Sequence, residues 1–196
     1  MPIRAIAGLG GAAIRSKLVL DTRKAGAEMP TLMLLRHGKS DWDSDATDDF
    51  ARPLAKRGRE ATKRMGAWMR GQRITPDHIV SSPARRARET AELMSEALDM
   101  EVERIHFDER LYLADTDVLT GVVRAYPPTA RCVMLIGHNP GFEDFLNYLC
   151  GEDLPVAANG KLMPTAALAR VELSCPWRKV GSHSGRLLDI TRPKDL

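Results

Sequence analysis

Two histidines follow apolar runs in this chain, and each run is long enough to be a buried strand. His37 lies near the end of residues 32–38, Leu-Met-Leu-Leu-Arg-His-Gly, and His138 follows residues 133–137, Val-Met-Leu-Ile-Gly. Such runs are typical of parallel strands that are covered on both faces. Open α/β sheets place their ligands at the carboxyl ends of parallel strands. We therefore expect both histidines at one edge of a sheet, in one site.

Two arginines complete a set of residues that suits phosphoryl chemistry. Arg36 precedes His37, and Arg86 comes soon after another predicted strand, at residues 78–81. A guanidinium group can bind the non-bridging oxygens of a phosphoryl group in a bidentate manner, through two hydrogen bonds at once. A neutral imidazole can attack phosphorus and form a phosphohistidine, which water then hydrolyses. A second histidine, His138, can donate to the oxygens that carry charge in the transition state.

Helix-start signals favour an anionic ligand at the same place. Residues 82–83, Ser-Pro, and 139–140, Asn-Pro, each pair an N-cap residue with a proline suited to the first helical position. Arg86 and His138 are then expected near helix N-termini, where free N–H groups and the helix dipole attract anions.

Strand and helix patterns alternate along the chain. Strands are expected at 31–36, 78–81, 101–105, 131–137, 167–173 and 187–190. Apolar residues at helical spacing predict four helices, with faces formed by Leu54, Ala61, Met65 and Trp68; by Ala87, Ala91, Met94 and Leu98; by Val118, Val122 and Tyr126; and by Phe142, Phe145, Leu146 and Leu149. This alternation predicts an α/β three-layer sandwich, with a mostly parallel central sheet and helices on both faces.

The charge distribution separates an N-terminal extension from the body of the chain. Of the 29 Lys and Arg and 26 Asp and Glu in the 196 residues, five and two lie in residues 1–28, so residues 29–196 carry 24 of each. The basic character therefore belongs to the extension and does not indicate a nucleic-acid surface. We interpret residues 1–28 as a disordered extension or a mis-assigned start before Met29, in preference to a targeting peptide. Residues 29–196 are expected to form one domain.

The cysteine content and hydropathy point to a cytoplasmic protein. Cys132, Cys150 and Cys175 are odd in number, far apart and without metal-ligand spacing, so reduced thiols are expected. No apolar run approaches the length needed to span a membrane, and no membrane partner is expected. No carboxylate or Cys/His cluster suggests a metal, and no cofactor is expected.

Three motifs resemble a known enzyme family. Residues 35–40 (Leu-Arg-His-Gly-Lys-Ser), 81–87 (Ser-Ser-Pro-Ala-Arg-Arg-Ala) with Thr90, and 137–140 (Gly-His-Asn-Pro) resemble the signatures of the histidine phosphatase superfamily, which includes the cofactor-dependent phosphoglycerate mutases. Residues 49–54 (Asp-Phe-Ala-Arg-Pro-Leu) with Gly58, and the ending at 191–194, are most similar to its SixA-like phosphohistidine phosphatase branch. The resemblance covers residues 30–194 in order and implies a phosphoglycerate mutase-like fold.

The resemblance also implies roles for individual residues. His37 would be the nucleophile, with Arg36, Arg86 and His138 around the phosphate. The family's spacing after the serine selects Arg86 in preference to Arg85. Further phosphate contacts are expected from Ser40 and Asn139, although Ser40 is equally suited to a turn.

One departure from the family pattern bears on the leaving group. Mutase-like members carry a general acid soon after an Arg-Leu pair, whereas residues 110–111, Arg-Leu, are followed here by Tyr-Leu-Ala at 112–114. An alkoxide leaves poorly without a proton donor, but an imidazole is readily protonated near neutral pH. Asp115 is a possible substitute acid, but it also suits a helix cap. The acidic residues Asp41, Asp43, Asp45, Asp48 and Asp49 are expected to form a solvated loop.

Together these features predict a metal-independent phosphatase that acts through a phosphohistidine intermediate. The predicted substrate is phosphohistidine on a protein, for example a phosphorelay domain. The alternatives are a broad phosphomonoesterase that acts on small molecules, and a phosphoprotein-binding module without turnover.

Overall fold

The computed structural model describes residues 29–157 and 160–196. Its helices are α1 (Lys56–Gly71), α2 (Arg85–Ala97), α3 (Thr116–Arg124) and α4 (Gly141–Cys150), and its strands are β1 (Thr31–Arg36), β2 (His78–Ser81), β3 (Ile105–Phe107), β4 (Cys132–Gly137), β5 (Leu168–Leu173) and β6 (Gly185–Thr191). The extension predicted at 1–28 lies outside the described residues. Within the described ranges, no helix has the length and apolarity to cross a bilayer.

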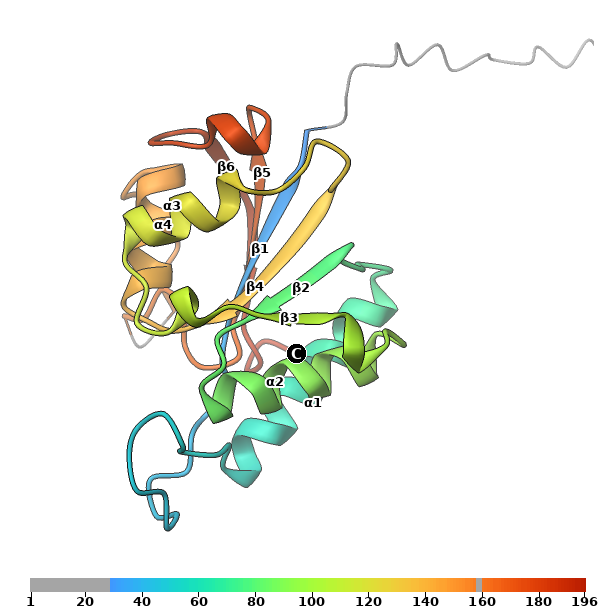
Figure 1. Cartoon of the computed structure of the whole chain (residues 1–196), viewed down its shortest axis with the longest axis vertical. Coiled ribbons are helices and arrows are strands. Elements are labelled where there is room, and N and C mark those ends of the chain that lie inside the picture. The colour runs from blue at the N-terminus through green and yellow to red at the C-terminus, as the bar shows by residue number, and fades with distance from the viewer. Residues whose placement is uncertain (1–28, 158–159) are drawn as a thin grey trace, which may run out of the picture.

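The strands form one mixed sheet in the order β3-β2-β4-β1-β5-β6 (Figure 1). Strands β3, β2, β4 and β1 pair in parallel, whereas β5 pairs antiparallel with both β1 and β6. The prediction of a mostly parallel central sheet is therefore confirmed, with β5 as the strand that runs against the others.

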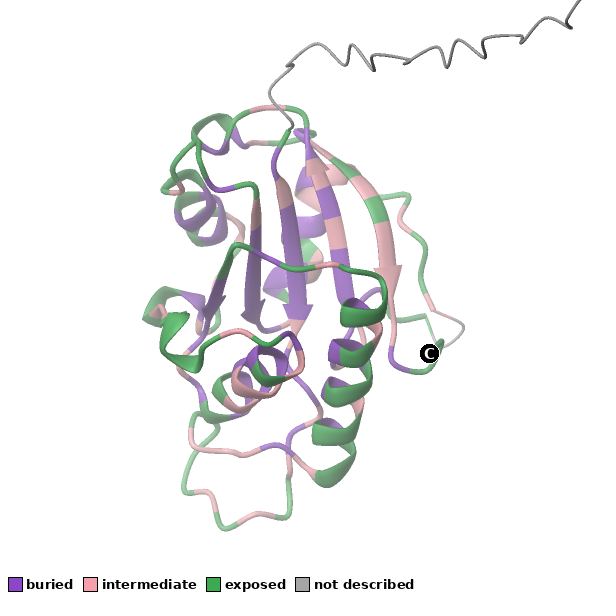
Figure 2. Cartoon of the chain, turned by 90° about the vertical axis from the view of Figure 1, so that its right-hand side faces the viewer, coloured by how far each residue is buried: buried purple, intermediate pink, exposed green. Residues whose placement is uncertain are grey.

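Each central strand buries both of its faces, which explains its uninterrupted apolar sequence. Along β1, Leu32 and Leu34 pack with α3 and α4, while Met33 and Leu35 pack with α1 and α2. This alternation follows from the two-residue period of a strand. Figure 2 shows the central strands almost wholly buried, with each helix exposing only its outer side. The three layers follow the predicted sandwich.

Two predicted strands have different limits in the structure. The strand expected at 101–105 is instead a 3-10 turn at Val102–Arg104 followed by β3, and the last strand, expected at 187–190, spans Gly185–Thr191. Both are edge strands of the sheet. An edge strand pairs on one side only, so its extent depends on its single neighbour more than on its own apolar pattern.

Candidate active site

The register of the parallel strands brings three loop starts together. The N–H of His37 donates to the carbonyl oxygen of Gly137 at 3.0 Å, and the N–H of Ser82 donates to that of Ile136 at 2.9 Å. The residues that follow β1, β2 and β4 therefore leave the sheet side by side. As a result, the rings of His37 and His138 lie with their centroids 5.0 Å apart, at the edge where the ligand was expected.

His37 presents a neutral nitrogen to the site. Its Nδ1 lies 2.7 Å from the carbonyl oxygen of Gly38, which can only accept, so Nδ1 carries the proton. Burial, and then electrostatic coupling to His138 and the charges of Arg86 and Arg36, lower the pKa of His37 to about 3, although the hydrogen bond with Gly38 opposes this shift. Nε2 therefore keeps its lone pair at neutral pH, and it accepts from Nε of Arg86 at 3.3 Å.

His138 is fixed in the opposite tautomer. Its Nδ1 accepts from Nη2 of Arg86 at 3.3 Å, so in the neutral ring its Nε2 carries the proton and donates to Oγ of Ser82 at 2.9 Å. Burial and the charges of Arg86 and Arg36 lower the pKa of His138 to about 4, although Asp49 opposes this shift. Both rings thus turn a lone pair toward the same guanidinium.

Arg86 lies between the two histidines and is held from its outer side. It is the second residue of α2 and is buried. Nη1 donates to the carbonyl oxygen of Asp49, and Nη2 donates to Oδ2 of Asp49 at 2.7 Å. Thr90, one helical turn later, accepts from the N–H of Gly38 at 3.0 Å and donates to the carbonyl oxygen of Arg86 at 2.6 Å. Thr90 therefore ties α2 to the loop that carries His37.

Arg36 retains an unused buried donor. Its Nη1 donates to the carbonyl oxygen of Met163 at 2.8 Å, whereas its Nε is buried without a partner. Burial lowers the pKa of Arg36, although the charge of Glu143 opposes this. Buried donors are almost always paired in proteins, so the free Nε suits an anionic ligand. Asn139 donates to the same Met163 oxygen at 3.1 Å and leaves its own Oδ1 unpaired.

The structure does not bring Ser40 to the histidines. Ser40 forms an isolated bridge with Leu54, and it lines a cavity of about 640 Å³ that neither histidine nor Arg86 borders. The turn interpretation of Ser40 therefore fits the structure better than a phosphate contact. Arg85 pairs at the surface with Glu89 at 3.0 Å, which leaves Arg86 as the arginine that faces the site.

Gly38 is required for close packing and not for an unusual backbone angle. Among the described glycines, only Gly151 and Gly160 have a left-handed φ angle, so the φ angle of Gly38 is one that other residues can adopt. A Cβ atom at Gly38 would lie 2.8 Å from the carbonyl oxygen of Gly58 and 2.9 Å from Oγ1 of Thr62. The loop after β1 therefore presses directly against α1.

The helix starts differ from the predicted caps. Helix α2 begins at Arg85 after Ala84, while Oγ of Ser82 accepts from the N–H of Ala84 at 3.3 Å. Helix α4 begins at Gly141, with Pro140 as its N-cap residue. Neither proline occupies the first helical position, because the loops that carry Ser82 and His138 continue for one or two residues more. Both site residues nevertheless lie beside helix N-termini, as expected.

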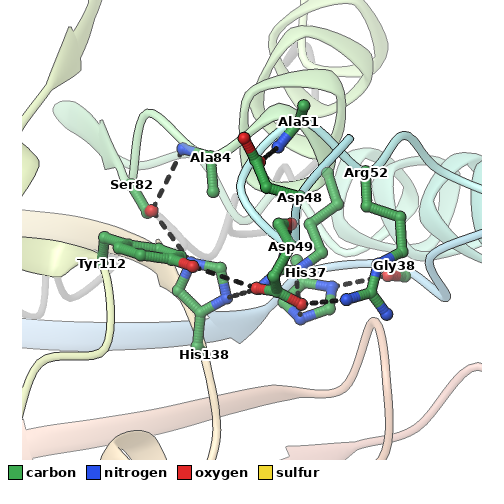
Figure 3. Close-up of polar contacts among 11 residues, drawn as sticks. His37, Gly38, Asp48, Asp49, Ala51, Arg52, Ser82, Ala84, Tyr112 and His138 are labelled. Atoms are coloured by element: carbon green, nitrogen blue, oxygen red, sulfur yellow. Dashed lines mark hydrogen bonds and ion pairs between the residues drawn. The ribbon is translucent and has the colours of Figure 1, made fainter. Parts of the chain in front are cut away.

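The sequence interpretation missed two residues of the site, Asp49 and Tyr112. Asp49 was expected in a solvated loop, but its Oδ2 binds Arg86 and also accepts from the hydroxyl of Tyr112 at 3.1 Å (Figure 3). Partial burial raises the pKa of Asp49, but hydrogen bonds and charge from Arg86, with Tyr112 and Arg52, outweigh this and lower it overall. Asp115, the possible substitute acid, instead caps α3 by accepting from the N–H of Val118 at 2.9 Å.

Signals for both missed residues were present in the chain. Asp49 is the first residue of the quoted motif at 49–54, and Tyr112 directly follows the Arg-Leu pair at 110–111, in the segment where the resemblance leads one to expect an acid. In the described part of the chain, no group of three or more His, Cys, Asp or Glu side chains is arranged to hold a metal ion.

Comparisons with known proteins identify the family of this chain. A sequence profile of the histidine phosphatase superfamily (branch 1) matches residues 32–125. The solved structure of the SixA protein of Agrobacterium tumefaciens is 30% identical, superposes with a TM-score of 0.71, and covers 84% of this chain and 98% of its own. The chain therefore belongs to the histidine phosphatase superfamily.

The curated relatives narrow the family further. Phosphohistidine phosphatase SixA of Escherichia coli is 26% identical over 143 residues, which cover 72% of this chain and 84% of that protein. An uncharacterized chloroplastic protein of Arabidopsis thaliana is 32% identical over 131 residues, and this chain spans 60% of its length. Within the superfamily, the chain belongs to the SixA-like branch of phosphatases.

Proposed function

We propose that the protein hydrolyses a phosphoryl group through a covalent phosphohistidine on His37, with protein phosphohistidine as its substrate. The observation that carries the proposal is the position of Arg86, whose Nε and Nη2 lie 3.3 Å from the lone-pair nitrogens of His37 and His138. A phosphoryl group that takes these two donors would lie between the two rings.

In the first step, Nε2 of His37 attacks phosphorus and the bond to the leaving group breaks. The attacking ring gains positive charge, which its Nδ1–H shares with the carbonyl oxygen of Gly38 at 2.7 Å. The guanidiniums of Arg86 and Arg36 hold the equatorial oxygens, where the transition state spreads its negative charge. In the second step, water attacks the phosphohistidine and releases inorganic phosphate.

His138 would act as an acceptor before it acts as a donor. Its Nδ1 faces Arg86 with a lone pair, so it donates to a phosphoryl oxygen only after it takes up a proton. The negative charge of the incoming phosphate favours that uptake. Ser82 holds the opposite nitrogen at 2.9 Å, so the ring stays oriented in both protonation states.

Support for phosphohistidine comes from the region around Tyr112. Residues 112–114 contain no carboxylic acid and Asp115 caps α3, while Asp49, which accepts from the hydroxyl of Tyr112, is ionised by its contact with Arg86. A site without a protonated acid suits a leaving group that brings its own proton, as an imidazole does. The SixA relatives are named for activity on phosphohistidine.

The proposal can be tested by comparing three substrates without added metal: a phosphohistidine protein, p-nitrophenyl phosphate and a sugar phosphate. We expect fast release of phosphate from the first, slow release from the second and almost none from the third. Rapid quenching should reveal an acid-labile, base-stable phosphoryl group, and this group should be absent from the His37→Ala variant.

Other outcomes would favour the alternatives. Similar rates on all three substrates would indicate a broad phosphomonoesterase. Tight binding of the phosphohistidine protein without phosphate release would indicate a binding module. Full activity in the folded His37→Ala variant would exclude the covalent mechanism.

A further inference from the structure

We propose that Asp49 determines the substrate class of the site by accepting the ring N–H of a leaving imidazole. This inference rests on the proposed function and names the residue that receives the leaving group. It assigns a part in the reaction to a side chain that the sequence placed in a solvated loop.

Asp49 is anchored on three sides by donors. Oδ2 accepts from Arg86 at 2.7 Å and from the hydroxyl of Tyr112 at 3.1 Å, while Oδ1 pairs with Arg52. Arg52 is itself placed by Trp42, whose ring centre lies 3.5 Å from the guanidinium carbon. A carboxylate in such a setting is ionised and has a fixed orientation.

The anchored carboxylate still has room for one more donor. A carboxylate offers about four lone-pair positions, and the three contacts of Asp49 with Arg86, Tyr112 and Arg52 use three of them. Its side chain remains 45% exposed, although that of Arg86 is only 7% exposed. The free position therefore opens toward solvent, from which a substrate approaches.

A row of aromatic rings runs from His37 past the carboxylate of Asp49 to the surface. Ring centroids are 5.0 Å apart from His37 to His138, 5.5 Å from His138 to Tyr112 and 5.0 Å from Tyr112 to Phe50. Phe50 is 41% exposed, so the row ends at the surface. In Figure 3 a dashed line joins the hydroxyl of Tyr112 to the carboxylate of Asp49, which is drawn between the rings of His138 and His37. A flat ring attached to the phosphorus would therefore meet aromatic walls on the side where the carboxylate lies.

The transfer balances without any external acid. The substrate is an N-phosphoimidazole that is protonated on its other ring nitrogen. Nε2 of His37 donates its electron pair to phosphorus, the bond from phosphorus to the substrate nitrogen breaks, and that nitrogen keeps the bonding pair. The substrate leaves as a neutral imidazole whose remaining N–H points to Asp49. His37 becomes the phosphoimidazolium, with its own N–H on the carbonyl oxygen of Gly38.

The two imidazoles thus have matching partners across the phosphorus. Gly38 holds the N–H of the attacking ring, and Asp49 would hold the N–H of the leaving ring. A negative charge beside the leaving ring favours its protonated, activated form before transfer. The same ionised carboxylate cannot protonate an alkoxide, so it gives no help to a sugar phosphate.

The Asp49→Asn variant provides the test. Asparagine keeps the size and one acceptor oxygen for Arg86 and Tyr112, but it removes the charge. We expect kcat/KM for a phosphohistidine peptide to fall roughly tenfold to a hundredfold more than kcat/KM for p-nitrophenyl phosphate, whose leaving group needs no partner. Asp49→Glu should recover part of this selectivity because it restores the charge.

Asp48→Asn serves as the matched control, since Asp48 accepts from the N–H of Ala51 at 2.8 Å and does not contact Arg86. Asp48→Asn should leave kcat/KM unchanged for both substrates. An equal loss on both substrates in Asp49→Asn would mean that Asp49 only positions Arg86, and unchanged rates would exclude any contact; either result would overturn the inference. A failure of the proposed function is distinguishable, because the wild-type protein itself would then release no phosphate from the peptide.

Discussion

The Nε–H of Arg86 points at Nε2 of His37 from 3.3 Å, so the group that would bind the phosphate directly contacts the nitrogen that would attack it. In the same guanidinium, Nη2 lies 3.3 Å from Nδ1 of His138. A single planar side chain therefore contacts both rings, and it would bind an anion placed between them. A point charge cannot do this, because it lacks the directed pair of donors.

The first prediction concerns the geometry of this arginine. Arg86→Lys should lower kcat/KM for the phosphohistidine substrate by on the order of 10³, because lysine keeps the charge but loses the fork that spans both rings. Arg85→Lys is the control on the neighbouring, surface-exposed residue, and it should stay within about twofold. Steady-state kinetics on both variants would measure this. A loss of similar size in Arg85→Lys would contradict the assignment of Arg86.

The second prediction concerns the orientation of His138. Ser82→Ala removes the acceptor that lies 2.9 Å from Nε2 of His138, so we expect kcat to fall about tenfold. Ser95→Ala is matched in residue type and burial, but Ser95 donates to the carbonyl oxygen of Met100, away from the histidines. It should reduce stability slightly without changing kcat. Equal kinetics for the two variants would leave Ser82 without a role in catalysis.

The third prediction follows from the lowered pKa values of the two histidines. Burial lowers the pKa of His37 to about 3 and that of His138 to about 4, from an ordinary value of 6.5. As the pH falls below 6.5, the unfolded chain binds protons that the folded protein does not, so the free energy of unfolding must decrease until the pH approaches the folded values. Above pH 6.5 both states are neutral, and this contribution to the pH dependence vanishes.

Urea unfolding at pH 7 and pH 5 would measure this effect. The free energy of unfolding should fall more in the wild-type protein than in a His37→Gln, His138→Gln double variant, which lacks both titrating groups. Identical decreases in the two proteins would show that the histidines titrate normally in the folded state.

The fourth prediction concerns packing of the loop that carries His37. A methyl group at Gly38 would lie 2.8 Å from the carbonyl oxygen of Gly58, and backbone cannot move aside easily, so Gly38→Ala should cost about 1–3 kcal/mol of stability. Gly71→Ala is the control, because a Cβ there meets nothing within 4 Å. Gly71→Ala should leave the free energy of unfolding unchanged or raise it by up to about 1 kcal/mol, because alanine favours the helix more than glycine does. Thermal unfolding of the two variants would separate the effects.

Much of the architecture could be predicted from local patterns. The central strands are apolar on both faces, so their sequence indicates their burial without any knowledge of their partners. Prediction failed for β3, a three-residue edge strand that is defined by its pairing with β2. It also failed for the helix starts near Ser82 and Asn139, where the site loops continue past the residues that suit a cap.

The site shows the same division between local and long-range information. His37 and His138 could be placed together because parallel strands end at a common edge. Asp49 could not be placed, because its contact with Arg86 depends on the path of a whole loop between β1 and α1. Local charge density predicted a solvated loop, and the structure does leave Asp49 exposed, but it also pairs this one acid of the stretch with Arg86 and Tyr112.

By itself, then, the sequence determined which residues stand at the strand ends and which chemistry they can perform. Residue types and periodicity are properties of short segments, so they survive without a structure. Only the tertiary structure decided which nitrogen of each ring faces the site, and that Asp49 and Tyr112 join it. The reason is physical: a tautomer is set by the partner of the other ring nitrogen. For His138, Arg86 fixes the tautomer, because its guanidinium can only donate to Nδ1 and so leaves the proton on Nε2; Arg86 belongs to α2, which follows a different strand.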